Sequence, residues 1–171
     1  YYQTPQAHRF NAFPLLIILC AYAATRILFF HQTLHTDFAD ALGMDETYYY
    51  NWATAIANGK IIGNTVLYGM PLYAYFVAGL FALFGKSLMV IRYAQALLGG
   101  LNCLLVYGIA ARIFSKQTGL LAAGLFVLYG LFAYFEWHIV SVTLFTTLSL
   151  SGILLLILYN NKPAAGTILL S

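Results

Sequence analysis

The chain has 171 residues, of which 62% are hydrophobic and only 8% are charged, and its formal net charge is +3. Soluble domains carry about 25% charged residues, so this composition argues against a water-soluble globular enzyme and against a disordered tail. The positive charge is too small and too scattered to form a phosphate-binding face, and we expect no nucleic-acid partner. The predicted surroundings of this chain are therefore the lipid bilayer.

Long apolar runs predict an all-α fold, a polytopic membrane helix bundle with about four to five spans, because a spanning helix needs about 20 apolar residues. In chain order we expect spans at 12–30, 88–113, 118–135 and 139–159, and the start of a further span at 163–171. The chain begins at Tyr1 and stops inside an apolar run, so we expect it to be a fragment of a longer membrane protein.

Small residues at four-residue spacing lie within two of these spans. Ala96 and Gly100 form one such pair, and Gly119 and Ala123 form the other. In lipid, pairs of this kind allow helix backbones to approach closely. We expect them to be contact points between helices.

Residues 31–87 form the outer loop, in which we expect juxtamembrane helices at about 45–58 and about 70–84. The first has Asp45 and Glu46 in its first turn, where acids suit the helix dipole, and Gly59 as its C-cap. The second is only about 22 Å long, which is short for a bilayer core of about 30 Å. It either lies along the interface or crosses as a short span.

The placement of charge favours a second helix that does not cross. The basic residues Arg9, Arg112, Lys116 and Lys162 then lie on one side, and all five acids lie on the other: Asp37, Asp40, Asp45, Glu46 and Glu136. By the positive-inside rule the first side, which includes residues 1–11, is cytoplasmic, and the acidic loop is periplasmic or extracellular. A crossing helix would instead move Arg112 and Lys116 to the acidic side.

The polar residues of the outer loop have a plain structural interpretation. An exposed loop needs charge, and Asp45 and Glu46 at the start of a helix are ordinary capping residues. Tyr49 and Trp52 are typical interfacial anchors, and a platform for stacking a sugar is the functional alternative.

Several motifs carry a family resemblance, and they occur in the order Asp45-Glu46-x-x-Tyr49-x-x-Trp52-Ala53, Ile56-Ala57-x-Gly59, Pro71-Leu72-Tyr73-x-Tyr75-Phe76, Leu83-Phe84-Gly85-Lys86-Ser87 and Arg92-x-x-Gln95-Ala96-Leu97-Leu98-Gly99. They resemble the N-terminal transmembrane module of the GT-C-fold glycosyltransferases that use polyprenyl-phosphate sugars. The nearest group is the glycosyltransferase family 39 type, relatives of the protein O-mannosyltransferases and the lipid A aminoarabinose transferases. The resemblance runs from about Arg26 to Tyr159, and it implies a bacterial inner-membrane enzyme with a periplasmic acidic loop.

The resemblance also implies catalytic roles. Asp45 matches the acidic residue proposed as the base that deprotonates the acceptor hydroxyl, and Glu46 would orient the acceptor or a metal. The leaving phosphate needs cationic partners, and the available ones are Arg26, Lys60, Lys86 and Arg92. Arg26 lies near the outer end of its span, so it either snorkels to the interface or is functional.

Two places could bind a metal. Some members of the GT-C class place a second acid in a later outer loop, which makes Glu136 a weak candidate ligand for a divalent cation. His31 and His35 have helical i,i+4 spacing and, with Asp37, could form a zinc site. Solvated loop histidines are the simpler interpretation, and no family motif supports the zinc site.

Three readings of the function remain. The first is an enzyme that transfers a sugar from a polyprenyl-phosphate donor to an unknown acceptor hydroxyl. The second is a truncated, non-catalytic relative that acts as a scaffold beside other membrane subunits. Such a scaffold would not need the Asp45–Glu46 pair. A transporter is less favoured, because the predicted spans carry no acid or histidine at mid-membrane depth.

Overall fold

The computed structural model describes residues 13–37, 39–60 and 69–160, and within these ranges the only regular secondary structure is α-helix. This confirms the all-α class. The helices are α1 (Phe13–Leu34), α2 (Met44–Ala57), α3 (Pro71–Phe84), α4 (Leu88–Ile113), α5 (Lys116–Leu128), α6 (Gly130–Trp137) and α7 (Val142–Asn160). The expected N-terminus at 1–11 and the start of a further span at 163–171 lie outside the described residues.

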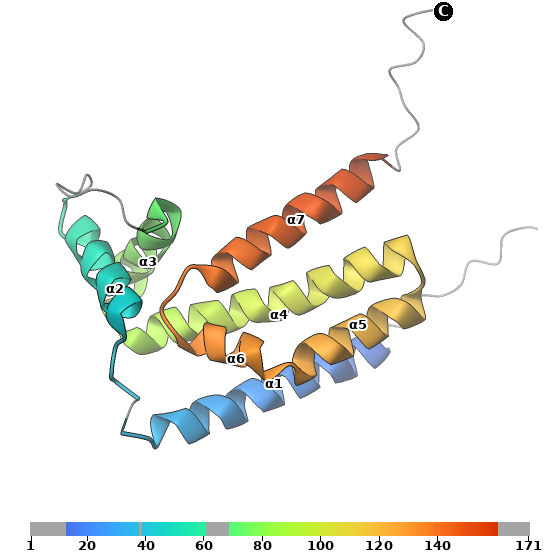
Figure 1. Ribbon diagram of the computed structural model, residues 1–171, viewed down its shortest axis with the longest axis horizontal. Coiled ribbons are helices and arrows are strands. Elements are labelled where there is room, and N and C mark those ends of the chain that lie inside the picture. The colour runs from blue at the N-terminus through green and yellow to red at the C-terminus, as the bar shows by residue number, and fades with distance from the viewer. Residues whose placement is uncertain (1–12, 38, 61–68, 161–171) are drawn as a thin grey trace, which may run out of the picture.

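The long helices run side by side, and α2 and α3 pair with each other at one end of them (Figure 1). The central helix is α4, with α7 on one side and with α5 and α1 on the other (Figure 1). Of the described helices, α1, α4 and α7 are long and apolar enough to cross a membrane, and α5 with α6 makes a fourth span if the bent pair is one. The expected polytopic bundle is therefore the observed architecture.

The segment expected to form one span at 118–135 is divided. Tyr129 adopts an extended conformation between α5 and α6, and the two helices meet at an angle of 57°. As a result Glu136, which we expected in an outer loop, lies on the last turn of α6 and is buried in the bundle. The apolar composition of this segment concealed the break, because every residue from 119 to 135 suits a span.

Both small-residue pairs lie at helix contacts, as their spacing predicts. Gly119 of α5 packs so closely on α4 that a Cβ atom there would lie 2.9 Å from the Tyr107 carbonyl oxygen. The Ala96 carbonyl of α4 lies 2.6 Å from the hydroxyl of Tyr22 in α1, and Gly100 faces the same tyrosine ring. These contacts fix the distances from α4 to α5 and to α1.

A buried ion pair joins α1 to α6. Arg26 Nε and Nη2 donate to the two oxygens of Glu136 at 2.7 and 3.1 Å, and both residues are almost fully buried. The Tyr22 hydroxyl lies 2.9 Å from Glu136 Oε2, and Arg26 Nη1 donates to the carbonyl of Val127. Because an unpaired charge in this position would be very costly, the pair holds the two helices in one relative position.

A polar stripe on α4 supports the same region. It consists of Arg92, Gln95 and Asn102, with Gly99 between them, at spacings that place all four on one face of the helix. Gln95 Nε2 donates to the carbonyls of Glu136 and His138 at 2.9 and 2.8 Å, which are among the carbonyls that the end of α6 leaves without helical partners. The chain between α6 and α7 is therefore held against α4 by side-chain hydrogen bonds.

A substitution at Gly99 tests this packing. A Cβ atom at Gly99 would overlap the Glu136 carboxylate and the Tyr22 hydroxyl, so we expect Gly99→Ala to lower the free energy of unfolding by about 1–3 kcal/mol. Thermal unfolding in detergent measures the loss. Gly124→Ala is the control, because a Cβ atom at Gly124 meets nothing within 4 Å. Equal melting temperatures for the two variants would contradict the close approach.

Candidate functional site

The site begins at the first turn of α2. Glu46 Oε2 accepts a hydrogen bond of 2.8 Å from the amide of Gly43, which satisfies one of the amides that a helix start leaves unpaired. At the other end Gly59 has a φ of +91°, the left-handed conformation that terminates helices. Both termini of α2 therefore lie close to where the sequence predicts them.

Glu46 is also the contact between α2 and the segment that follows α6. Its Oε1 accepts a hydrogen bond of 2.8 Å from the Ile139 amide and lies 3.0 Å from His138 Nδ1. Glu46 is buried, and each of its oxygens has a partner. In the structure the carboxylate of Glu46 anchors backbone and His138, while the residue also lines one wall of the second cavity described below.

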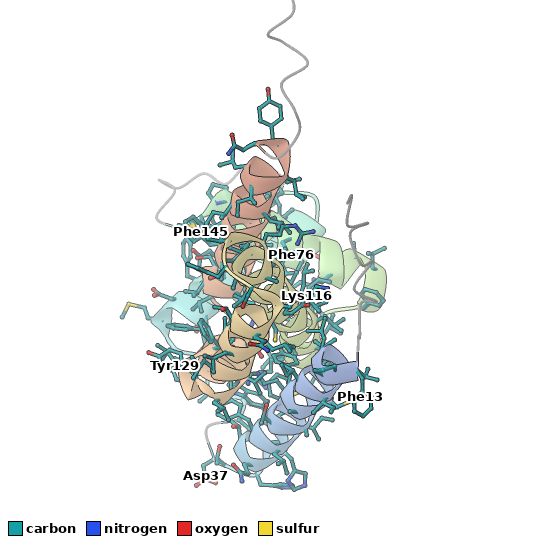
Figure 2. The ribbon with its side chains drawn as sticks, turned by 90° about the vertical axis from the view of Figure 1, so that its right-hand side faces the viewer. Phe13, Asp37, Phe76, Lys116, Tyr129 and Phe145 are labelled. Carbon is teal, nitrogen blue, oxygen red and sulfur yellow. The ribbon has the colours of Figure 1, made fainter. Side chains whose placement is uncertain are left out.

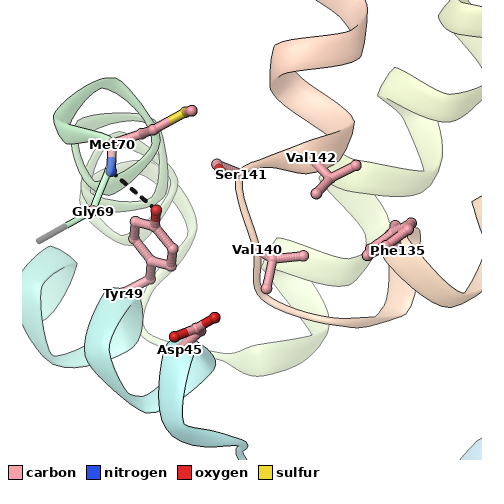
Figure 3. A pocket seen from close by; sticks show the side chains of 8 residues that line it. All are labelled: Asp45, Tyr49, Gly69, Met70, Phe135, Val140, Ser141 and Val142. Carbon is pink, nitrogen blue, oxygen red and sulfur yellow. Dashed lines mark hydrogen bonds between the residues drawn. The ribbon is translucent and has the colours of Figure 1, made fainter.

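Asp45, the neighbour of Glu46, is exposed and faces two adjoining cavities. The first has a volume of about 520 Å³ and is lined by Asp45, Tyr49, Gly69, Met70, Phe135, Val140, Ser141 and Val142. Asp45 and Tyr49 line it from α2, opposite Val140 and Ser141 (Figure 3). The second, of about 640 Å³, adds Tyr134 and His138. A carboxylate at the junction of two cavities can take a proton from a group bound in either.

The aromatic residues proposed for substrate binding mainly pack α2 against its neighbours. Tyr49 is buried, and its hydroxyl accepts a hydrogen bond of 3.0 Å from the Met70 amide. Its ring meets Tyr73 edge-on at 4.8 Å between centroids. Trp52 is half-buried beside Tyr48, at 5.5 Å. Of the two candidates, only Tyr49 also lines the cavity beside Asp45.

Tyr73 connects α3 to the polar stripe of α4. Its hydroxyl donates to Gln95 Oε1 at 2.5 Å. Burial raises the pKa of Tyr73 well above its usual value, and the charge of Glu46 adds to this effect. The phenol therefore stays protonated and keeps this hydrogen bond at every physiological pH, which fixes the α2–α3 pair relative to the bundle.

The two candidate arginines are engaged inside the protein. Arg26 neither snorkels nor faces a cavity, since Glu136 holds it. Arg92 lies over the ring of Trp137, 3.7 Å from its centroid, and donates to the carbonyls of Ala39 and Trp137. Neither guanidinium lines the cavities beside Asp45.

The two candidate lysines lie at the far end of α2. Lys86 Nζ donates to Asn58 Oδ1 at 2.8 Å, and Asn58 follows Asp45 by 13 residues of helix, or about 20 Å. Lys60 is exposed two residues beyond Asn58. The structure does not bring either lysine close to Asp45, so the four predicted cations do not form one site with it.

The structure does not bring three metal ligands together at either place that the sequence suggested. The carboxylate of Glu136 is bound by Arg26 and Tyr22. Within the ranges that the structure describes, no group of three or more histidine, cysteine, aspartate or glutamate side chains could hold a metal ion. Beside Asp45, too, the described residues do not gather the three ligands that such a group would need.

The structure adds residues that sequence reasoning missed. His138 lines the second cavity and is oriented by Glu46, and its ring lies 4.1 Å from that of Tyr134. Ser141 lines the first cavity. The available signal was the polar break Glu136-Trp137-His138 between apolar runs, which we placed on the outer face without assigning a role to the histidine.

Comparison with known proteins identifies one family. The model of the family described as dolichyl-phosphate-mannose-protein mannosyltransferase matches residues 69–168, more than half of the chain. The match includes α3 to α7 and begins after the end of α2, so Asp45 lies outside it. No curated protein and no solved structure matches the chain.

The anchoring role of Glu46 gives a local prediction. Glu46→Gln removes the charge that accepts bonds from Ile139 and Gly43, so we expect a loss of about 1–3 kcal/mol. Thermal unfolding measures the loss, and amide hydrogen exchange at Ile139 should accelerate. The control is Asp45→Asn, an exposed change of the same kind in the next residue. Unchanged exchange at Ile139 in Glu46→Gln would show that the contact is not holding this segment.

Proposed function

Because the chain belongs to the dolichyl-phosphate-mannose-protein mannosyltransferase family, which consists of membrane glycosyltransferases of the GT-C kind, we propose that it transfers a sugar from a polyprenyl-phosphate donor to an acceptor hydroxyl, with Asp45 as general base. The observation that carries the proposal is the position of Asp45. It is an exposed carboxylate at the junction of two cavities, in a chain with only five acidic residues.

Asp45 is better suited to act as the base than the other acids around it. Glu46 is occupied by the Ile139 and Gly43 amides, and Glu136 is occupied by Arg26. No ion pair engages Asp45 among the described residues. A general base needs an accessible lone pair within hydrogen-bond reach of the proton that it removes, and Asp45 meets that need.

The proposed reaction balances without a further reagent. Asp45 takes the proton of the acceptor hydroxyl, and the oxygen attacks the anomeric carbon of the donor sugar. The bond from that carbon to the phosphate oxygen breaks, and the polyprenyl phosphate leaves with the electron pair. Attack from the side opposite the phosphate inverts the configuration at the anomeric carbon.

The described region supplies only part of this machinery. Arg26 and Arg92 are held inside the bundle. Lys60 and Lys86 lie at the C-terminal end of α2, and Asp45 lies at the other end of this helix, about 20 Å away. We therefore assign to this region the base and the acceptor side of the reaction, and not the binding of the leaving phosphate.

The proposed location follows from the distribution of charge. Asp37 and Asp40 lie between α1 and α2, and Asp45 and Glu46 lie in the first turn of α2. The turn from α4 to α5, with Arg112 and Lys116, is at the opposite end of the bundle (Figure 1). By the positive-inside rule we propose a bacterial inner membrane with the Asp45 end in the periplasm.

The proposal predicts the behaviour of Asp45→Asn in membranes that carry the full-length protein. Asparagine cannot accept the proton, so we expect sugar transfer to fall by about 10²–10⁴-fold with the melting temperature unchanged. Transfer of radiolabelled sugar from a polyprenyl-phosphate donor measures the rate. Asp37→Asn, an exposed acid of the same loop outside both cavities, should retain full transfer. Full transfer by Asp45→Asn would exclude this residue as the base.

A further inference from the structure

Two histidines at the end of α1 face each other. His31 and His35 are one helical turn apart, and both are exposed. Their Nε2 atoms lie 3.3 Å apart, closer than their ring centroids, which are 4.5 Å apart. The two nitrogens therefore converge in solvent at the C-terminal end of α1. Figure 2 labels Asp37, which follows this end.

The spacing of these nitrogens matches a tetrahedral metal. With zinc–nitrogen bonds of about 2.05 Å, two nitrogens 3.3 Å apart subtend about 107° at the metal. A tetrahedral ion needs about 109°, whereas a square-planar Cu²⁺ ion needs about 90° and nitrogens about 2.8 Å apart. Without a metal, the same two nitrogens form a hydrogen bond when one of the rings carries its Nε2 proton.

We propose that His31 and His35 form a two-ligand site for Zn²⁺. No third histidine, cysteine, aspartate or glutamate completes a group of three in the described part of the chain, so Asp37 is not a ligand here and the three-ligand site considered from the sequence does not form. The remaining two positions of a tetrahedral ion are open to water or to an external ligand. This inference is independent of the proposed transfer reaction.

A bound ion would stabilise the end of α1. The last carbonyls of a helix have no helical partners, and here Thr33 already bonds back to the Phe29 carbonyl at 2.8 Å. An ion bound by His31 and His35 would connect two successive turns at this end. The chain continues from there through the segment that leads to Gly43 and α2, so the ion would fix one boundary of the loop that carries Asp45.

Zinc binding can be measured directly on the full chain in nanodiscs, purified through a tag without histidine. Competition with a chromophoric zinc chelator should give one Zn²⁺ per chain that depends on both histidines. We expect His31→Ala and His35→Ala each to weaken this binding by roughly tenfold or more. The loss of a group that merely hydrogen-bonds to a metal ligand already has an effect of about that size. Both residues are exposed, so neither substitution should prevent folding.

A matched control keeps the number of histidines and changes only their spacing. In the double variant Gln32→His/His35→Ala, the two histidines are adjacent in sequence and do not share a helix face, so zinc binding should fall to the level of His35→Ala. Binding of Co²⁺ to the unaltered protein should give the intense visible absorption of a tetrahedral complex. Equal zinc affinity in all variants, or no zinc binding by the unaltered protein, would overturn the proposal.

Discussion

The structure depends on one ion pair inside a lipid-facing bundle. Arg26 and Glu136 are buried at 4% and 1% exposure, and removing either partner would leave a charge that costs several kcal/mol. Gly99 gives the carboxylate room to reach α4, and Tyr22 completes its hydrogen bonds. Because Glu136 is on the last turn of α6, the pair also fixes the point from which the chain crosses to α7.

That fixed point determines the site. Gln95 holds the carbonyls of Glu136 and His138, and Glu46 holds the amide of Ile139, so the segment after α6 is fastened both to α4 and to α2. The next residues, Val140 and Ser141, then form one wall of the cavity beside Asp45. The two adjacent acids of α2 differ in their surroundings. Glu46 is buried and anchors the helix, and Asp45 is exposed and faces the two cavities, where we propose that it acts as the base.

The sequence predicted what depends on local pattern. Apolar runs and capping residues located the helices, and the scarcity of charge drew attention to Asp45 and Glu46. The sequence could not predict contacts between residues far apart in the chain. Arg26 and Glu136 are separated by 110 residues, and periodicity carries no information on which helices pack against each other. The same limit explains why Glu136 was considered for a metal, why Arg92 was considered for a phosphate and why the break at Tyr129 was missed.

A double-mutant cycle on Arg26 and Glu136 tests the central claim most directly. Arg26→Leu, Glu136→Leu and the double variant are compared with the unaltered protein by unfolding in detergent. The structure predicts that each single change costs about 3–5 kcal/mol, because it leaves one buried charge unpaired, and that the double change costs much less than their sum. Costs that simply add would contradict a bundle organised by this ion pair.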